Sequence, residues 1–167
     1  MKFELAWEDG RESWLEASRF FAQTIALDPA YISHGEIQTG LSLDGQSWIP
    51  DLEARFLAEA ASDDEPRSLA VVRDADGRVI GAAAISWSFE TPDAPFATLQ
   101  DMSIDPDVRS HGIGNALVAF VEQEALRRGA SWLFLESGKD NVRAHHFFER
   151  CGFAEVSHVF AKRLPRP

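Results

Sequence analysis

The segment from Phe96 to Leu126 constrains the fold of this chain more than any other part. An apolar run typical of a strand ends at Asp105-Pro106, and apolar residues recur with the period of a helix from Ile113 onward. Between them lies the sequence RSHGIG, residues 109–114. Glycines let the backbone approach a ligand closely, and the first N–H groups of a helix lack partners within the helix. The segment therefore predicts a strand, a tight turn suited to an anion such as pyrophosphate, and a helix.

A Gly-x-Gly turn alone is a weak signal, because most such turns only connect two elements. Its surroundings are more specific, since Met102, Ile104 and Pro106 alternate directly before the Arg-x-x-Gly-x-Gly pattern. Strand-like residues 132–136 then lead to an Asn-x-x-Ala helix pattern, residues 141–153, that closes with Gly-Phe. These two motifs, in this order, resemble the acyl-CoA-binding segment and the following helix of the GNAT family of N-acetyltransferases. Residues 69–153 carry the resemblance, and the first 65 residues hardly contribute.

The resemblance implies an α/β fold of GNAT type, with a mixed, mostly antiparallel central sheet of about six to seven strands flanked by about four helices. We expect one domain over residues 1–167. The pattern of apolar residues predicts strands at 3–7, 68–72, 79–89, 96–104, 131–136 and 154–164. It predicts helices at 14–27, at 51–61, from 113 to a C-cap glycine at 129, and at 141–153 with the closing Gly-Phe included. Residues 62–66 should break the second helix, and residues 30–50 show no clean period.

The distribution of charge bears on the partners of the chain. The net charge is −11, and residues 1–90 hold 7 basic against 17 acidic side chains. Nucleic acid is disfavoured as a partner, because phosphate backbones are bound by clustered Lys and Arg. The acidic half fits a cationic acceptor, although high net charge also serves solubility. With no apolar run of membrane-spanning length and no signal-peptide core, we expect a cytoplasmic protein without a membrane partner.

The family resemblance also implies which residues bind the acyl-CoA. The backbone of the turn would hold the pyrophosphate, the last residues of the central strand would pair with the pantetheine arm, Asn141 would bond to that arm or cap its own helix, and a Phe would pack near the thioester. The residues implied are Met102, Ser103, Ile104, Arg109, Ser110, His111, Gly112, Ile113, Gly114, Asn141, Phe147 and Phe148. Acetyl-CoA is therefore the expected co-substrate, and we expect no metal.

Acyl transfer to an amine needs a base, because an unperturbed ammonium group has a pKa of about 10. The first candidate is Glu136, where the resembling enzymes often hold a glutamate, and Asp101 and Glu36 are the alternatives. Many family members place a Tyr as general acid where this chain has Phe148, which has no proton to give. A thiol pKa of about 8.5 lets the thiolate leave with little help. The change also fits a non-catalytic acyl-CoA sensor, and a longer acyl group is a further alternative.

The acceptor is expected to be a primary amine of a small molecule or peptide. Its candidate contacts lie in the irregular segment or on neighbouring strands, and they are Tyr31, His34, Glu36, Trp48, Trp87 and Gln100. Cys151, the only cysteine, is expected to be a small buried hydrophobe, which favours direct transfer over an acyl-enzyme. A homodimer is compatible with the family, but no apolar stripe demands one.

Overall fold

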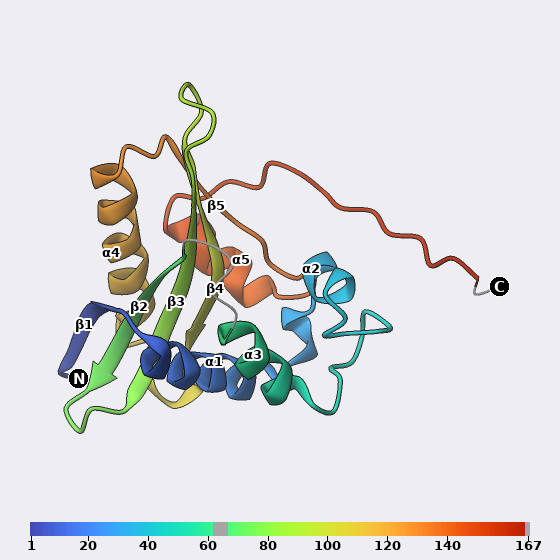
Figure 1. The fold of residues 1–167 in the computed structure, drawn as a ribbon, viewed down its shortest axis with the longest axis horizontal. Coiled ribbons are helices and arrows are strands. Elements are labelled where there is room, and N and C mark those ends of the chain that lie inside the picture. The colour runs from blue at the N-terminus through green and yellow to red at the C-terminus, as the bar shows by residue number, and fades with distance from the viewer. Residues whose placement is uncertain (62–66, 166–167) are drawn as a thin grey trace. The chain divides into compact units, whose positions relative to one another are not determined.

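A computed structural model describes residues 1–61 and 67–165 of the chain (Figure 1). The fold is mixed α/β, as expected, and the chain groups into two compact units. The first unit comprises residues 1–28 and 50–136, and the second comprises residues 29–49 and the part of the chain after residue 136. The expected break at residues 62–66 lies outside the described residues.

The first unit is built on a five-stranded sheet with the order β1-β2-β3-β4-β5. The pairs β1–β2, β2–β3 and β3–β4 are antiparallel, and the pair β4–β5 is parallel. A parallel pair needs a crossover connection, and helix α4 supplies it. The strands are β1 (Phe3–Glu8), β2 (Arg67–Asp74), β3 (Val79–Ser88), β4 (Phe96–Ile104) and β5 (Trp132–Leu135).

Helices cover both faces of this sheet. They are α1 (Arg11–Ile25), α3 (Leu52–Ala60) and α4 (Ile113–Arg127). Gly81 on β3 lies against α4, since an added Cβ would come within 3.4 Å of the Ile113 side chain. Ala84, three residues further along the strand, lines a pocket with residues of α1 and α3. Because successive residues of a strand point to opposite faces, α4 packs on one face and α1 with α3 on the other.

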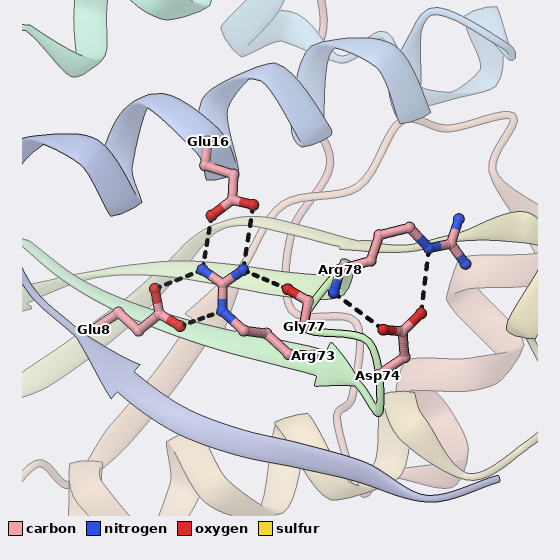
Figure 2. A network of polar contacts seen from close by, with 6 residues as sticks. All are labelled: Glu8, Glu16, Arg73, Asp74, Gly77 and Arg78. Atoms are coloured by element: carbon pink, nitrogen blue, oxygen red, sulfur yellow. Dashed lines mark hydrogen bonds and ion pairs between the residues drawn. The ribbon is translucent and has the colours of Figure 1, made fainter.

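A polar network joins the first strands to α1 (Figure 2). The guanidinium of Arg73 donates to Glu8 at 2.8 and 2.9 Å, to Glu16 at 2.7 and 3.2 Å, and to the Gly77 carbonyl at 2.9 Å. The hydrogen bonds from Arg73 hold the pKa of Glu8 below its ordinary value. This one side chain therefore fixes β1, α1 and the β2–β3 turn to each other.

The second unit contains the 3-10 helix Pro29–Tyr31, α2 (His34–Gln38) and α5 (Val142–Arg150). Helix α2 lies in the segment for which the sequence predicted no regular element. It begins with a capping box, in which Gly35 N–H donates to the Ser33 hydroxyl at 3.3 Å and Ser33 N–H donates to Glu36 at 2.7 Å. The Ser-x-x-Glu spacing that marks this motif was available in the sequence.

The expected strand at residues 154–164 is wrong, because the structure assigns no strand after α5 in the described chain. The apolar side chains of this segment lie in solvent, with Phe160 93% and Val156 73% exposed. A strand needs a neighbour that takes up its backbone hydrogen bonds, and none of the described strands pairs with this segment. The described sheet thus has five strands rather than six to seven, and the described residues contain five α-helices rather than four.

Candidate active site

A β-bulge on β4 sets the geometry of the site. Asp101 pairs with Ala84 and Leu99 pairs with Ile85, so Gln100 is an extra residue on β4. Directly opposed residues of paired strands share a face, and the bulge therefore places Asp101 on the face of α1, opposite to Leu99. Gln100 itself is exposed at the bulge. No sequence motif marks this inserted residue.

Strand β4 also extends beyond its parallel neighbour. The ladder between β4 and β5 ends at the pair Leu99 and Leu135, and β4 continues for residues 100–104 with no partner on β5. This open edge holds Met102, Ser103 and Ile104, the residues that the sequence assigned to the pantetheine arm. An extended chain of amides can add to such an edge as a further strand.

The turn after β4 presents a row of main-chain N–H groups. Among the described residues, those of Ser110, His111, Gly112, Ile113 and Gly114 have no hydrogen-bond acceptor. The left-handed conformations of Ser110 (φ 68°) and Gly112 (φ 79°) produce this arrangement at the start of α4. Unpaired N–H groups at a helix N-terminus attract an anion. The sequence assigned a pyrophosphate to this turn, and that assignment stays a prediction.

Two side chains hold this turn from within. His111 Nδ1 lies 3.0 Å from the carbonyl oxygens of Val108 and Arg109. Arg109 Nε donates to the Ile104 carbonyl at 3.3 Å, and its main-chain N–H donates to the Pro106 carbonyl at 3.5 Å. The expected role of the Arg109 amide in holding the pyrophosphate is therefore not supported, because that N–H has an acceptor within the protein.

The three candidate bases occupy different environments. Asp101 is partly buried and lines the pocket between β4, α1 and α3. Glu136 follows β5 and is exposed. Glu36 belongs to the second unit, where its carboxylate accepts from Ser33 in the capping box of α2. Of the three, Asp101 is the one that lines this pocket beside the bulge.

The candidate acceptor contacts are distributed over both units. Gln100 adjoins Asp101, but Trp87 lies on the other face of the sheet, where the Arg128 guanidinium stacks on its ring at 4.2 Å. Tyr31, His34 and Trp48 belong to the second unit. The Trp48 Nε1 is buried, and within the described part of the chain it has no hydrogen-bond partner.

In the second unit, Asn141 is the N-cap of α5. Its side-chain oxygen accepts from Ala144 N–H at 3.3 Å, which confirms the capping interpretation. The rings of Phe147 and Phe148 meet edge to face with centroids 5.1 Å apart. His145 is tied to its own unit, with its Nε2 lying 2.9 Å from the Gly138 carbonyl.

The described residues contain no group of three or more His, Cys, Asp or Glu side chains arranged to hold a metal ion. None of the helices described is long and apolar enough to cross a membrane.

The fold and site define a mixed α/β protein in which β4 carries a bulge, continues beyond its pairing with β5 and leads into a turn whose N–H groups have no acceptor among the described residues. The model of the GNAT acetyltransferase family matches residues 4–153, and the chain belongs to this family.

Characterised relatives cover part of the chain. The chain is 35% identical over 95 residues to a streptothricin acetyltransferase of Streptomyces lavendulae, covering 57% of this chain and 49% of that protein. It is 30% identical over 95 residues to an aminoglycoside N(6')-acetyltransferase type 1 of Stenotrophomonas maltophilia, covering 54% of this chain and 62% of that protein. The chain thus spans about half the length of the first of these relatives and under two thirds of the second.

Solved structures share the fold over nearly the whole chain. A ribosomal-protein-alanine N-acetyltransferase from Brucella melitensis biovar Abortus has a TM-score of 0.63 and 16% identity, covering 98% of this chain and 100% of that one. An aminoglycoside N-acetyltransferase in complex with CoA has a TM-score of 0.62 and 17% identity, covering 98% and 95%. At this level of identity the comparison establishes the fold, and the chemistry must be argued from the residues of this chain.

Proposed function

We propose that this chain transfers an acetyl group from acetyl-CoA directly to a primary amine. One observation carries the proposal: the open edge of β4 leads directly into a turn whose five main-chain N–H groups have no acceptor among the described residues. Coenzyme A has the matching chemistry, since an arm with two amides ends in a pyrophosphate. A main chain can recognise both parts without dedicated side chains.

The amides of residues 110–114 bind the pyrophosphate, and residues 102–104 pair with the pantetheine arm. The start of α4 adds the favourable end of a helix dipole, so the site needs no cluster of basic side chains. Residues 91–167, which contain this turn, are accordingly nearly neutral in net charge, although the proposed ligand is a polyanion. The contributions of Asn141, Phe147 and Phe148 to the same ligand stay predictions from the sequence.

Asp101 is the base that we favour over Glu136. The acceptor amine reaches the pocket as an ammonium ion and must lose a proton before its nitrogen can attack the thioester carbonyl. Asp101 takes that proton, directly or through a water, and the amine nitrogen then bonds to the carbonyl carbon. The carbon–sulfur bond breaks, and the second proton of the nitrogen passes to water. The thiolate leaves without an acid, because a thiol has a pKa of about 8.5, and Phe148 is therefore no obstacle.

The test measures CoA release from acetyl-CoA with a panel of primary amines, for the unchanged protein, Asp101→Asn and Glu136→Gln. We expect Asp101→Asn to lower kcat at least about a hundredfold, in the range for loss of a general base, with the Kd of acetyl-CoA unchanged. Glu136→Gln serves as the matched control and should keep kcat within about threefold. The reverse result would return the role to Glu136.

A protein that binds acetyl-CoA but releases no CoA above the hydrolysis rate with any amine would instead be the non-catalytic sensor. Absence of acetyl-CoA binding by calorimetry would refute the proposal altogether.

A further inference from the structure

The pocket that holds Asp101 contains a second feature that the proposed reaction does not use. Besides Asp101 it is lined by Trp14 of α1, Glu59 of α3 and Arg67 of β2, above the apolar side chains of Phe21 and Phe56. The described lining residues therefore include two carboxylates, one guanidinium and one indole ring. All of these residues belong to the first unit.

Arg67 occupies a position suited to a cationic ligand. Its guanidinium carbon lies 4.8 Å from the centre of the Trp14 ring, and its Nη1 lies 3.7 Å from a Glu59 oxygen. An aromatic face together with a carboxylate is a general arrangement for binding an ammonium group. The Arg67 side chain is 17% exposed and that of Glu59 is 63% exposed, so solvent reaches the Glu59 side of this contact.

The contact between Arg67 and Glu59 is weak for its type. Strong charge-assisted hydrogen bonds between nitrogen and oxygen are about 2.7–2.9 Å long and often bidentate with Arg. The single separation of 3.7 Å to an exposed partner is an ion pair with little net stabilisation. A ligand cation can therefore compete with the guanidinium, which swings into solvent on its flexible stem.

We propose that Trp14 and Glu59 form a seat for a second cationic group of the acceptor, and that Arg67 fills this seat until the acceptor displaces it. The inference rests on the proposed function, because Asp101 in the same pocket receives the amine that is acetylated. An acceptor with two cationic groups contacts both Asp101 and the seat. A monoamine contacts only Asp101 and leaves Arg67 in place. The acceptor class is thus a diamine or a larger polycation, with Arg67 as a residue that determines specificity.

The experiment compares KM for α,ω-diaminoalkanes of increasing length with KM for n-alkylamines of matched length. Arg67→Gln removes the internal competitor, and we expect it to lower KM of the best diamine at least about fivefold while n-alkylamines change less than about twofold. Glu59→Gln removes the carboxylate and should raise the diamine KM at least about fivefold. Arg67→Lys, which keeps a cation, should stay near the unchanged protein.

Two substitutions on the same face control for charge and folding. Arg19→Gln and Glu53→Gln break a comparable exposed ion pair of 3.2 Å between α1 and α3, outside the pocket lining. They match the charge changes of the Arg67 and Glu59 variants, so a general effect of net charge on a cationic substrate would appear in them as well. We expect both controls to change the diamine KM by less than about twofold.

A binding measurement separates this inference from the proposed function. Calorimetric titration of the same diamine into the protein saturated with CoA reports the seat without turnover. If the variants shift this Kd as described while no amine is acetylated, the seat stands and the proposed reaction fails. If amines are acetylated but Arg67→Gln raises the diamine KM or leaves it unchanged, the seat is refuted. The seat would also be refuted if Arg67→Gln raised the KM only for amines that carry a carboxylate, since Arg67 would then bind an anion.

Discussion

Two glycines with nearly the same conformation give a direct test of the pyrophosphate turn. Gly112 in the turn before α4 has a φ of 79°, and Gly77 in the β2–β3 turn has a φ of 82°. At neither position would an added Cβ come within 4 Å of another group. An alanine at either site therefore adds strain from the left-handed backbone alone, about 1–2 kcal/mol.

The strain should appear in a different quantity for each alanine variant, either the free energy of unfolding or the Kd of CoA. Gly77 belongs to a hairpin turn fixed by the Arg73 network, so Gly77→Ala should lower the free energy of unfolding by about 1 kcal/mol and leave CoA binding unchanged. In the Gly112 turn the side chains of Arg109 and His111 hold the loop, but the N–H groups of residues 110–114 have no acceptors in the described chain, so an alanine at 112 can shift these groups without breaking a hydrogen bond. Binding must then restore the strained conformation, and a cost of about 1.4 kcal/mol corresponds to a tenfold higher Kd.

Urea unfolding of both variants and calorimetric titration with CoA make the comparison. We expect the Kd of CoA to rise about five- to tenfold for Gly112→Ala and to change by less than about twofold for Gly77→Ala. If Gly112→Ala binds CoA like the unchanged protein, the amides of this turn do not hold the pyrophosphate. Equal losses of affinity in both variants would point to a general effect of stability instead.

Two further predictions concern stability. Arg73→Met should lower the free energy of unfolding by about 2 kcal/mol at pH 7, because it leaves the partly buried carboxylate of Glu8 and the exposed carboxylate of Glu16 without their shared cation. The pKa of Glu8 in the folded protein lies below its ordinary value of 4.5. The loss in free energy of unfolding caused by Arg73→Met should therefore be largest above pH 4.5 and shrink as the pH falls below it. Urea unfolding of both proteins at several pH values measures this. Phe160→Glu should leave the melting temperature within about 2 °C, because the ring is 93% exposed; a larger drop would reveal that the ring is buried in solution.

The strand, turn and helix from Phe96 onward could be predicted because their signals are local. Apolar period, glycine conformation and the capping of a helix all depend on neighbouring residues. The same holds for Asn141, whose capping role was predicted and is confirmed by its contact with Ala144 N–H. The capping box from Ser33 to Glu36 is local too. Its Ser-x-x-Glu spacing marks the start of a helix, although the glycines around it disfavour one.

The terminal segment shows why an apolar pattern is not sufficient for a strand. Val156, Phe160 and Leu164 recur in a stretch with β-forming residues, but they lie exposed in the described chain. Whether such a stretch pairs depends on a neighbouring edge and not on its own residues. The apolar pattern that predicts a strand at 154–164 does not report whether such an edge is present.

The bulge at Gln100 is the part of the site that no local signal could reveal, and the orientation of the candidate base depends on it. In an unbroken β4 the side chain two residues after Leu99 would share its face, which is the face of Trp87 and α4. The inserted residue reverses this alternation, so that Asp101 lies opposite Ala84 in the pocket of Trp14, Glu59 and Arg67. The register between β3 and β4, fixed by pairing across the whole sheet, therefore decides which carboxylate meets a cation, and Glu136, favoured from the sequence, lies outside that pocket.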